Sequence, residues 1–172
     1  MIRIISGRYK GHRLNNISSK NIRPTQARVK KSMLQILEPF NGKTVLDLFS
    51  GSGSLGIEAL SRGASKVVSV ENNKKNFNIL SQNFDKIATD QNYDLIFMDA
   101  IKFLSTTKDK FDIIICDPPY YKYEYIEIFN MAVKIMKPGS LFCMEMEKNI
   151  VDENIFRVKL YGETQIILWT KK

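Results

Sequence analysis

The sequence predicts an α/β fold built on a doubly wound, mostly parallel sheet that ends in a C-terminal antiparallel hairpin. Between residues 44 and 146, short apolar runs alternate with amphipathic segments, and several runs are almost continuously apolar. Such runs are typical of parallel strands that helices cover on both faces. The tail differs. Its predicted strands, 156–161 and 164–170, are separated by only two residues, too few for a helical crossover.

The elements follow one another in a regular order. Residues 2–6 and 12–14 are predicted to form a small N-terminal hairpin around two glycines. A helix then begins near Thr25, which can cap it, and ends at Pro39 and Gly42. The elements that follow are strand 44–49, helix 54–62, strand 66–71, helix 73–88, strand 93–98, helical turn 100–106, strand 111–116, helix 124–136 and strand 140–146. We therefore expect a basic N-terminal hairpin and helix at 1–42 and a larger domain at 43–172.

The positive charge of the chain is concentrated near its start. Residues 1–37 carry nine of the 26 Lys and Arg side chains and no Asp or Glu, so the net charge of +8 arises entirely there. A lysine-rich composition would spread the charge along the whole chain, whereas this clustering is typical of a surface that binds a phosphate backbone. The candidates for nucleic-acid binding are Arg3, Arg8, Arg13, Arg23, Arg28, Lys30 and Lys31.

Composition also limits the protein class. With 172 residues, 44% of them hydrophobic, the chain can bury one substantial core. No run approaches the ~20 apolar residues of a membrane span, and the start lacks the apolar core of a secretory signal. The two cysteines, Cys116 and Cys143, fall in predicted strands, and His12 is the one histidine. We therefore expect a cytoplasmic monomer with no membrane contact, disulfide or metal.

The tetrapeptide Asp117-Pro118-Pro119-Tyr120 follows the apolar run 111–116 directly. A strand that ends this way presents a carboxylate, a backbone carbonyl held by proline and an aromatic face at one sheet edge. The Asp117 carboxylate and the Pro118 carbonyl can accept both N–H bonds of a planar amino group and direct its lone pair at an electrophile. Tyr120 can stack on the base that carries this amine. The alternative is an ordinary strand-to-loop turn, in which Asp-Pro pairs are common.

A glycine turn after the first sheet strand predicts a nucleoside cofactor. Gly51, Gly53 and Gly56 match G-x-G-x-x-G, which also occurs in dinucleotide sites. Asp47 would repel a pyrophosphate, but it can accept from the ammonium of S-adenosylmethionine, whose carboxylate the N–H groups of the turn can bind.

Two further acids follow the next strands of the predicted sheet. Glu71 is placed to accept from ribose hydroxyls, and Asp99 from the adenine amino group, with the Ala100 N–H offered to the ring. For both acids the alternative is a solvated strand end. The cofactor-binding candidates are Asp47, Phe49, Gly51, Ser52, Gly53, Glu71, Asn72, Asp99 and Ala100.

Taken together, these motifs resemble the S-adenosylmethionine-dependent amino-methyltransferases, which carry D-x-F-x-G-x-G and (D/N)-P-P-(F/Y). More narrowly, the chain resembles the RsmD-type 16S rRNA guanine-N2 methyltransferase family along nearly its whole length. The matching segments are 3–7, 11–14, 23–25 with 28–29, 46–56, 58–63 and 117–120. The resemblance implies a seven-stranded class I methyltransferase sheet, guanine N2 of 16S rRNA as the target, and the small ribosomal subunit or its assembly precursor as the substrate.

The chain departs from the family pattern after Arg23-Pro24-Thr25. Ala27 stands where the family usually has Asp, and Lys30-Lys31 stands for Arg-Glu. A second departure is Leu34-Gln35 in place of Phe-Asn. The tetrapeptide alone also admits adenine N6 in a nucleic acid or a protein glutamine amide as acceptor. A different class would be a non-catalytic RNA-binding assembly factor on a methyltransferase fold, against which the intact acids and glycines weigh.

Overall fold

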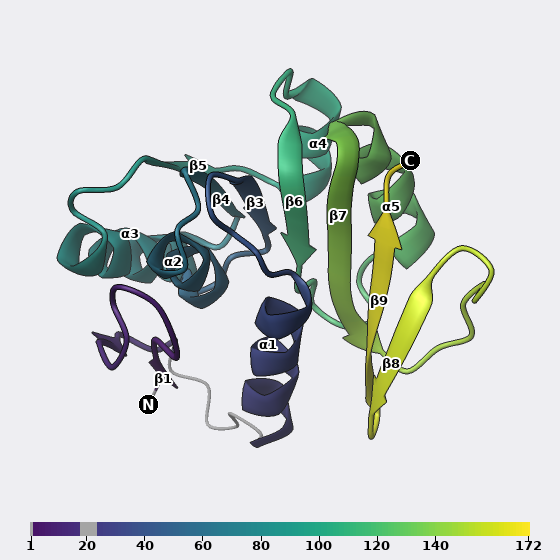
Figure 1. Ribbon diagram of the computed structural model, residues 1–172, viewed down its shortest axis with the longest axis horizontal. Helices are drawn as coiled ribbons and strands as arrows, with labels where there is room; N and C mark the ends of the chain where they lie inside the picture. Colours follow the sequence, from purple (N-terminus) through teal and green to yellow (C-terminus); the bar gives the residue numbers. More distant parts are fainter. Residues whose placement is uncertain (1, 18–23) are drawn as a thin grey trace.

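A seven-stranded sheet forms the centre of the computed structural model, which describes residues 2–17 and 24–172 (Figure 1). Its spatial order is β5-β4-β3-β6-β7-β9-β8. The strands are β3 (Thr44–Leu48), β4 (Lys66–Glu71), β5 (Tyr93–Phe97), β6 (Phe111–Cys116), β7 (Met136–Glu147), β8 (Arg157–Tyr161) and β9 (Thr164–Thr170). The first five are parallel, and β8 and β9 pair antiparallel. The predicted fold class is thereby confirmed, with β9 lying between β7 and β8.

Helices cover both faces of this sheet (Figure 1). The helices are α1 (Pro24–Ile36), α2 (Ser54–Ser61), α3 (Lys74–Ile87), α4 (Ala100–Thr106) and α5 (Tyr125–Lys134). Side chains of α1, α2 and α3 pack on one face, and those of α4 and α5 on the other. Strand β3 serves both layers, because Val45 packs with the first group and Leu46 with the second, and both are fully buried. Near-continuous apolar runs are the consequence of burying both faces.

The short strands β1 (Ile2–Arg3) and β2 (Arg13–Leu14) pair antiparallel and dock on α2. Buried Glu58 accepts hydrogen bonds from the Ile5 and Ser6 backbone N–H groups at 2.8 and 2.9 Å. A Cβ on Gly7 would lie 1.8 Å from the Ser61 carbonyl oxygen, so this close approach requires glycine. The two segments that carry part of the family resemblance, 3–7 and 58–63, are therefore in direct contact.

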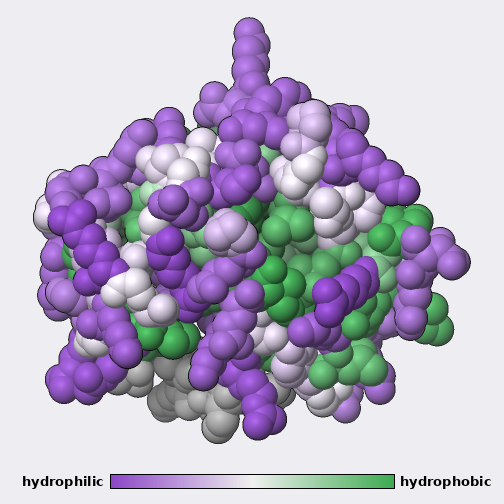
Figure 2. All heavy atoms as spheres, in the orientation of Figure 1, coloured by the Kyte–Doolittle hydropathy of each residue, from purple (hydrophilic) through white to green (hydrophobic). Residues whose placement is uncertain are grey.

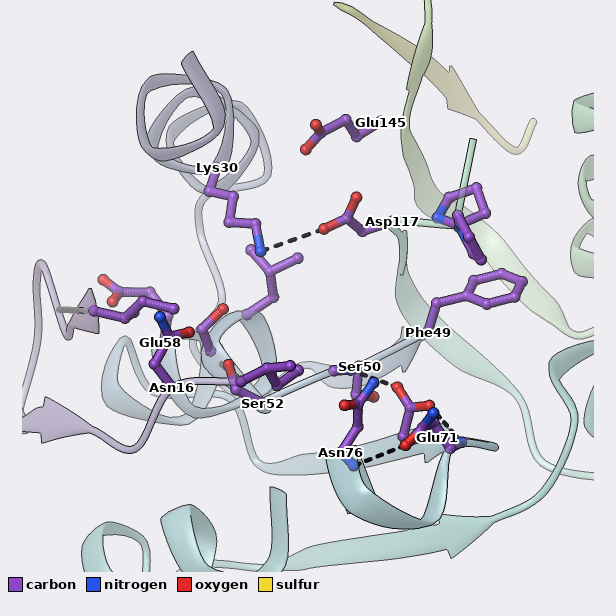
Figure 3. A pocket seen from close by; sticks show the side chains of 18 of the residues that line it. Asn16, Lys30, Phe49, Ser50, Ser52, Glu58, Glu71, Asn76, Asp117 and Glu145 are labelled. Carbon is purple, nitrogen blue, oxygen red and sulfur yellow. Dashed lines mark hydrogen bonds and ion pairs between the residues drawn. The ribbon is translucent and has the colours of Figure 1, made fainter. Parts of the chain in front are cut away.

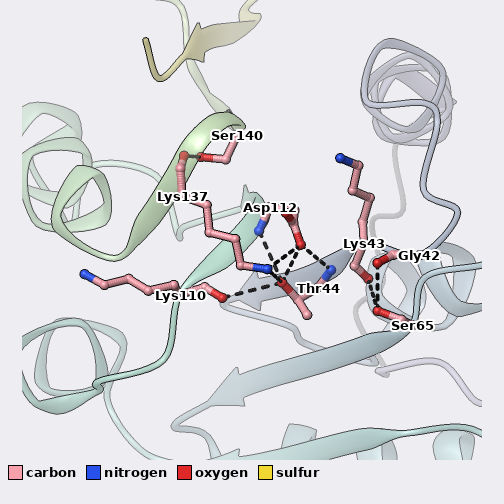
Figure 4. A network of polar contacts seen from close by, with 8 residues as sticks. All are labelled: Gly42, Lys43, Thr44, Ser65, Lys110, Asp112, Lys137 and Ser140. Carbon is pink, nitrogen blue, oxygen red and sulfur yellow. Dashed lines mark hydrogen bonds and ion pairs between the residues drawn. The ribbon is translucent and has the colours of Figure 1, made fainter.

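A polar cluster joins three strands at the edge of the sheet where β3 and β6 begin (Figure 4). Asp112 Oδ2 accepts from the Thr44 backbone N–H at 2.8 Å, from Thr44 Oγ1 at 2.7 Å and from Lys137 Nζ at 2.8 Å. Partial burial alone would raise the pKa of Asp112, but the hydrogen bonds from Lys137 and Thr44 lower it to about 2. The cluster aligns β3 and β6, whose opposite ends carry the predicted site.

Element boundaries differ from the sequence expectation mainly at β1, which ends at Arg3 where the strand was expected to reach residue 6, and at β7. Strand β7 begins at Met136, before Pro138 and Gly139, and α5 ends at Lys134. Lys137-Pro138-Gly139 was expected to be a helix stop with the strand starting at 140. A register shift between Phe111 and Ile113 accommodates the proline and glycine in the parallel ladder.

Figure 2 shows that hydrophilic side chains cover most of one face of the molecule, with apolar side chains gathered toward strands β7 to β9.

Candidate active site

A cavity of about 760 Å³ lies at the ends of β3, β4 and β6, beside α1 (Figure 3). Its lining brings together the glycine turn, Glu71 and Asn72, and the whole Asp117–Tyr120 tetrapeptide. These segments are far apart in sequence, but parallel strands β4, β3 and β6 are neighbours in the sheet, so their carboxyl ends converge. The sequence-predicted cofactor residues that line the cavity are Phe49, Gly51, Ser52, Glu71 and Asn72.

The glycine turn depends on one close packing contact. Gly53 caps α2 with φ 79°, and a Cβ there would lie 2.5 Å from Leu80 and 2.7 Å from Phe84, both on α3. Gly53 is buried and does not line the cavity, so it shapes the turn from behind. The glycine thereby sets where the N–H groups of the turn face.

Asp47 lies beneath this turn. It is fully buried, its Oδ2 accepts from the Gly56 N–H at 3.0 Å, and its Oδ1 has no hydrogen-bond partner among the residues the structure describes. Burial raises the pKa of Asp47 to about 7. Asp47 does not line the cavity, so its expected contact with a cofactor ammonium stays a prediction, while its contact with the start of α2 is direct.

Glu71 at the end of β4 is 7% exposed, and backbone N–H groups hold its carboxylate in place. Its Oε2 accepts from the Gly51 N–H at 2.8 Å, and its Oε1 from the Asn73 N–H at 2.7 Å (Figure 3). Each carboxylate oxygen has a further lone pair. Glu71 can therefore accept from two hydroxyl groups in the cavity without losing these bonds.

Asp99 and Ala100 lie outside the lining of this cavity. Asp99 Oδ1 caps α4 through the Ile101 and Lys102 N–H groups. Its Oδ2 accepts from Asn72 Nδ2 at 3.3 Å and from the Tyr123 hydroxyl at 3.2 Å. In this structure Asp99 thus links Asn72 and Tyr123, two residues that do line the cavity. Its proposed bond to an adenine amino group stays a prediction.

Asp117 follows β6 and faces Lys30 of α1 across the cavity (Figure 3). Lys30 Nζ lies 3.3 Å from Asp117 Oδ2. Burial by itself would lower the pKa of Lys30, but the charges of Asp117 and Glu145 raise it overall. Pro118 is buried and Pro119 exposed, and both line the cavity. The tetrapeptide is therefore part of a charged, partly enclosed site and is more than a solvated turn.

The hydroxyl of Tyr120 is tethered to the adjacent strands. It lies 2.8 Å from Thr164 Oγ1 and 3.3 Å from Glu145 Oε1. Burial raises the pKa of Tyr120 to about 12, so the hydroxyl keeps its proton. The residue is 37% exposed. A fixed aromatic ring with a partly open surface suits stacking against a planar group.

Glu145 is a site residue that the sequence analysis missed. It lies in β7 with 1% of its surface exposed, and it lines the cavity with Asp117 and Tyr120. The available sequence signal was an acid inside the apolar run Leu141–Met146. In the structure Glu145 follows Met144, whose register partner on β6 is Cys116. Burial, followed by the charge of Asp117, raises the pKa of Glu145 to about 7.

The predicted nucleic-acid-binding residues occupy different positions. Arg3 is exposed at the rim of the cavity, and Lys30 points into it. Arg8 forms an ion pair with Asp90, which offsets part of its charge. The other exposed members of the set are Arg13, Arg28 and Lys31. Arg23 lies outside the described residues.

A family model described as "Conserved hypothetical protein 95" matches residues 2–170. The chain belongs to this family. Ribosomal RNA small subunit methyltransferase D of Haemophilus influenzae is 34% identical over 161 residues, covering 86% of this chain and 80% of the relative. The protein of the same name from Buchnera aphidicola (strain APS) is 32% identical, covering 98% and 92%. The resemblance to the RsmD-type family is thereby confirmed.

Solved structures agree with this family assignment. The candidate methyltransferase yhhF from Escherichia coli is 27% identical, with a TM-score of 0.87 and coverage of 99% of this chain and 98% of that one. That structure therefore shares the overall fold of this chain along nearly its whole length. Among the described residues of this family member, no helix has the length and apolar character that a membrane crossing requires.

Proposed function

We propose that this protein methylates the exocyclic N2 amino group of a guanine in 16S rRNA, using S-adenosylmethionine and acting on the small ribosomal subunit or its assembly precursor. The observation that carries the proposal is one cavity that joins a nucleoside-type acid, Glu71, and the glycine turn to the Asp117–Tyr120 tetrapeptide. The names of the relatives support methylation of small-subunit rRNA. Guanine N2 as the methylated atom is our proposal and goes beyond what the names of the relatives state.

The residues present fit the proposed cofactor. Glu71 keeps lone pairs toward the cavity for ribose hydroxyls. The Gly51 N–H is held by Glu71, so Ser52, which also lines the cavity, is the residue of the turn that is available to the methionine carboxylate. Asp47 Oδ1, which has no hydrogen-bond partner among the described residues, is an acceptor close to the glycine turn. Phe49 and Tyr123, whose ring centroids lie 5.0 Å apart, form an apolar wall. When bound, S-adenosylmethionine supplies a methyl group on a positively charged sulfur.

The chain's own contribution to the transfer is to orient the amine. The Asp117 carboxylate and the Pro118 carbonyl accept its two N–H bonds, so that its lone pair faces the cofactor side of the cavity. The Lys30 ammonium lies beside Asp117 Oδ2, so an amine that binds this oxygen displaces it. Tyr120 stacks on the base. Asp117 can accept the proton afterwards, but a strong base is unnecessary because the sulfonium leaves readily.

We further propose that residues 1–42 contact RNA. Arg3 is exposed at the cavity rim, and Arg28 and Lys31 are exposed on α1, the helix that carries Lys30. Arginine and lysine here can pair with phosphates that flank the target nucleotide. Lys30 has a different place, because it is engaged inside the cavity.

The proposal is tested by mapping modified bases in rRNA from cells that lack this gene. Loss of one N2-methylguanosine supports it. Loss of N6-methyladenosine, or of a methylated glutamine in a protein, would identify a different acceptor. Absence of S-adenosylmethionine binding by calorimetry would favour a non-catalytic RNA-binding factor.

The role of Asp117 is tested with the purified enzyme. Asp117→Ala is expected to abolish methyl transfer while cofactor affinity stays within about threefold, because the carboxylate acts on the amine and the transition state. Asp109→Ala is the matched control, since Asp109 is an exposed acid just before β6. An equal loss of transfer and of cofactor affinity in Asp117→Ala would refute the role.

A further inference from the structure

Glu145 presents an acceptor to the cavity that the mechanism above does not use. Its Oε1 accepts from the Tyr120 hydroxyl, but its Oε2 has no hydrogen-bond partner within residues 2–17 and 24–172. Glu145 and Asp117 extend toward the same side, facing α1 and Lys30 (Figure 3). One oxygen is enough to hold Tyr120, so this contact does not account for the second.

An unpaired carboxylate oxygen is costly in such a place. Glu145 is 1% exposed, and a buried acceptor without a partner destabilises the site, more so when it is charged. Nearby Asp117 adds like-charge repulsion, which Lys30 only partly offsets. A hydrogen-bond donor that arrives with the substrate would relieve both the desolvation and the missing bond.

The position of Glu145 relative to Asp117 restricts what that donor can be. Cys116 and Met144 are register partners, so residues 117 and 145 follow side by side on neighbouring strands about 4.8 Å apart. Both carboxylates can therefore contact one edge of one planar base. If Asp117 holds the exocyclic amine, Glu145 can face the Watson–Crick ring nitrogen next to it.

Guanine differs from the other amino bases at that ring position. Its N1 carries a hydrogen beside the 2-amino group, whereas adenine N1 and cytosine N3, next to their amines, are lone-pair acceptors. A carboxylate binds the N1–H of guanine and repels the lone pairs of adenine N1 and cytosine N3. A site built to bond one donor rejects analogues that lack it far more strongly than an apolar pocket does.

We propose that Glu145 is the residue that selects guanine: its Oε2 accepts the N1–H of the target base while Asp117 holds the adjacent N2 amine. This inference rests on the proposed guanine-N2 activity and deepens it. Tyr120, which stacks on the same base, fixes the other oxygen of Glu145 through its hydroxyl. The stacking ring and the base-reading acid are thus positioned together.

The test compares guanosine with 2-aminopurine riboside at the mapped target position, in 16S rRNA ligated from synthetic and transcribed pieces and assembled into subunits. 2-Aminopurine keeps the 2-amino group, but its N1 is an acceptor. The wild-type enzyme is expected to prefer guanosine by about 100-fold or more in kcat/KM. In Glu145→Gln the amide N–H can donate to the N1 of 2-aminopurine, so the preference should narrow by about tenfold or more.

Glu147→Gln is the matched control, because Glu147 lies two residues further along β7 and does not line the cavity. Its preference should equal that of the wild type. If the wild type methylates guanine N2 and Glu145→Gln keeps the full preference, the specificity role is wrong while the proposed function stands. If the wild type transfers no methyl group to guanine N2, the proposed function itself fails.

A second measurement needs no variant. The groups that face Glu145 are Lys30 from α1, Asp117 after β6 and Tyr120 in the loop that follows. At about pH 6 a larger fraction of Glu145 is protonated than at about pH 8, and the protonated acid can donate to 2-aminopurine N1. The wild-type preference for guanosine should therefore fall on acidification. A preference that is constant or rises would overturn the assignment.

Discussion

The polar cluster around Asp112 gives a prediction whose size follows from the structure. Its pKa is lowered from 3.8 to about 2 in the folded chain, chiefly by hydrogen bonds from Lys137 and Thr44. Each factor of ten in proton affinity is worth ~1.4 kcal/mol, so the ionised form stabilises the fold by about 2 kcal/mol at neutral pH. Asp112→Asn removes this charge and should lower the free energy of unfolding by about that amount.

The sign of the pH dependence follows from the lowered pKa. Stabilisation is fully present above the unfolded value of 3.8 and is lost as the pH falls through about 2. The difference between wild type and Asp112→Asn should therefore shrink from about 2 kcal/mol at pH 7 to about 1 kcal/mol at pH 3. Urea unfolding can be followed by the fluorescence of Trp169, whose ring packs on Phe129 at 5.1 Å between centroids.

Asp109→Asn serves as the control, because Asp109 is exposed and removal of its charge should change stability by less than about 0.5 kcal/mol. Cofactor affinity should stay unchanged in Asp112→Asn, since the cluster lies at the opposite end of β3 and β6 from the cavity. An equal difference at pH 7 and pH 3, or none at pH 7, would refute the electrostatic reasoning.

Two further predictions concern the cavity and the glycine turn. Lys30→Met removes the charge that lowers the pKa of Glu145, so the acid limb of the pH profile of kcat/KM for guanosine should move to higher pH. Lys30→Arg keeps the charge and should keep the wild-type profile. An unchanged profile in Lys30→Met would count against this coupling. Gly53→Ala should lower the free energy of unfolding, measured in thermal melts, by about 1–3 kcal/mol more than Gly11→Ala does. Both glycines have positive φ, but of the two only Gly53 has described side chains that a Cβ would meet. Equal costs would exclude the steric contribution.

Most of the sheet could be predicted because local pattern and burial agree. Strands 66–71 and 111–116 match the structure at both ends, and the short Gly162-Glu163 link correctly required an antiparallel hairpin. The beginning of β7 was missed, because Pro138-Gly139 resembles a helix stop. Tertiary pairing with β6 and β9 overrides that local signal.

The positions of site residues that directly follow a strand could be predicted from the sequence. The side-chain contacts between residues far apart in sequence could not. Glu71 and Asp117 were placed correctly at one edge because parallel strands share their direction. The contacts of Asp47 and Asp99 with backbone N–H groups depend on side-chain direction, which sequence spacing does not give. Glu145 was missed because an acid within an apolar strand becomes informative only when its neighbours are known.

Lys30 shows why the N-terminal extension and the catalytic cavity must be considered together. Charge counting grouped it with residues that bind phosphate, but α1 places its ammonium against Asp117 and near Glu145. Without that charge the pKa of buried Glu145 would be raised further beside Asp117, and a protonated Glu145 has one acceptor site fewer. Lys30 therefore favours the ionised form of Glu145, which is the form that we propose accepts the guanine N1–H. Helix α1 of the N-terminal extension thereby contributes to the charge state of the cavity.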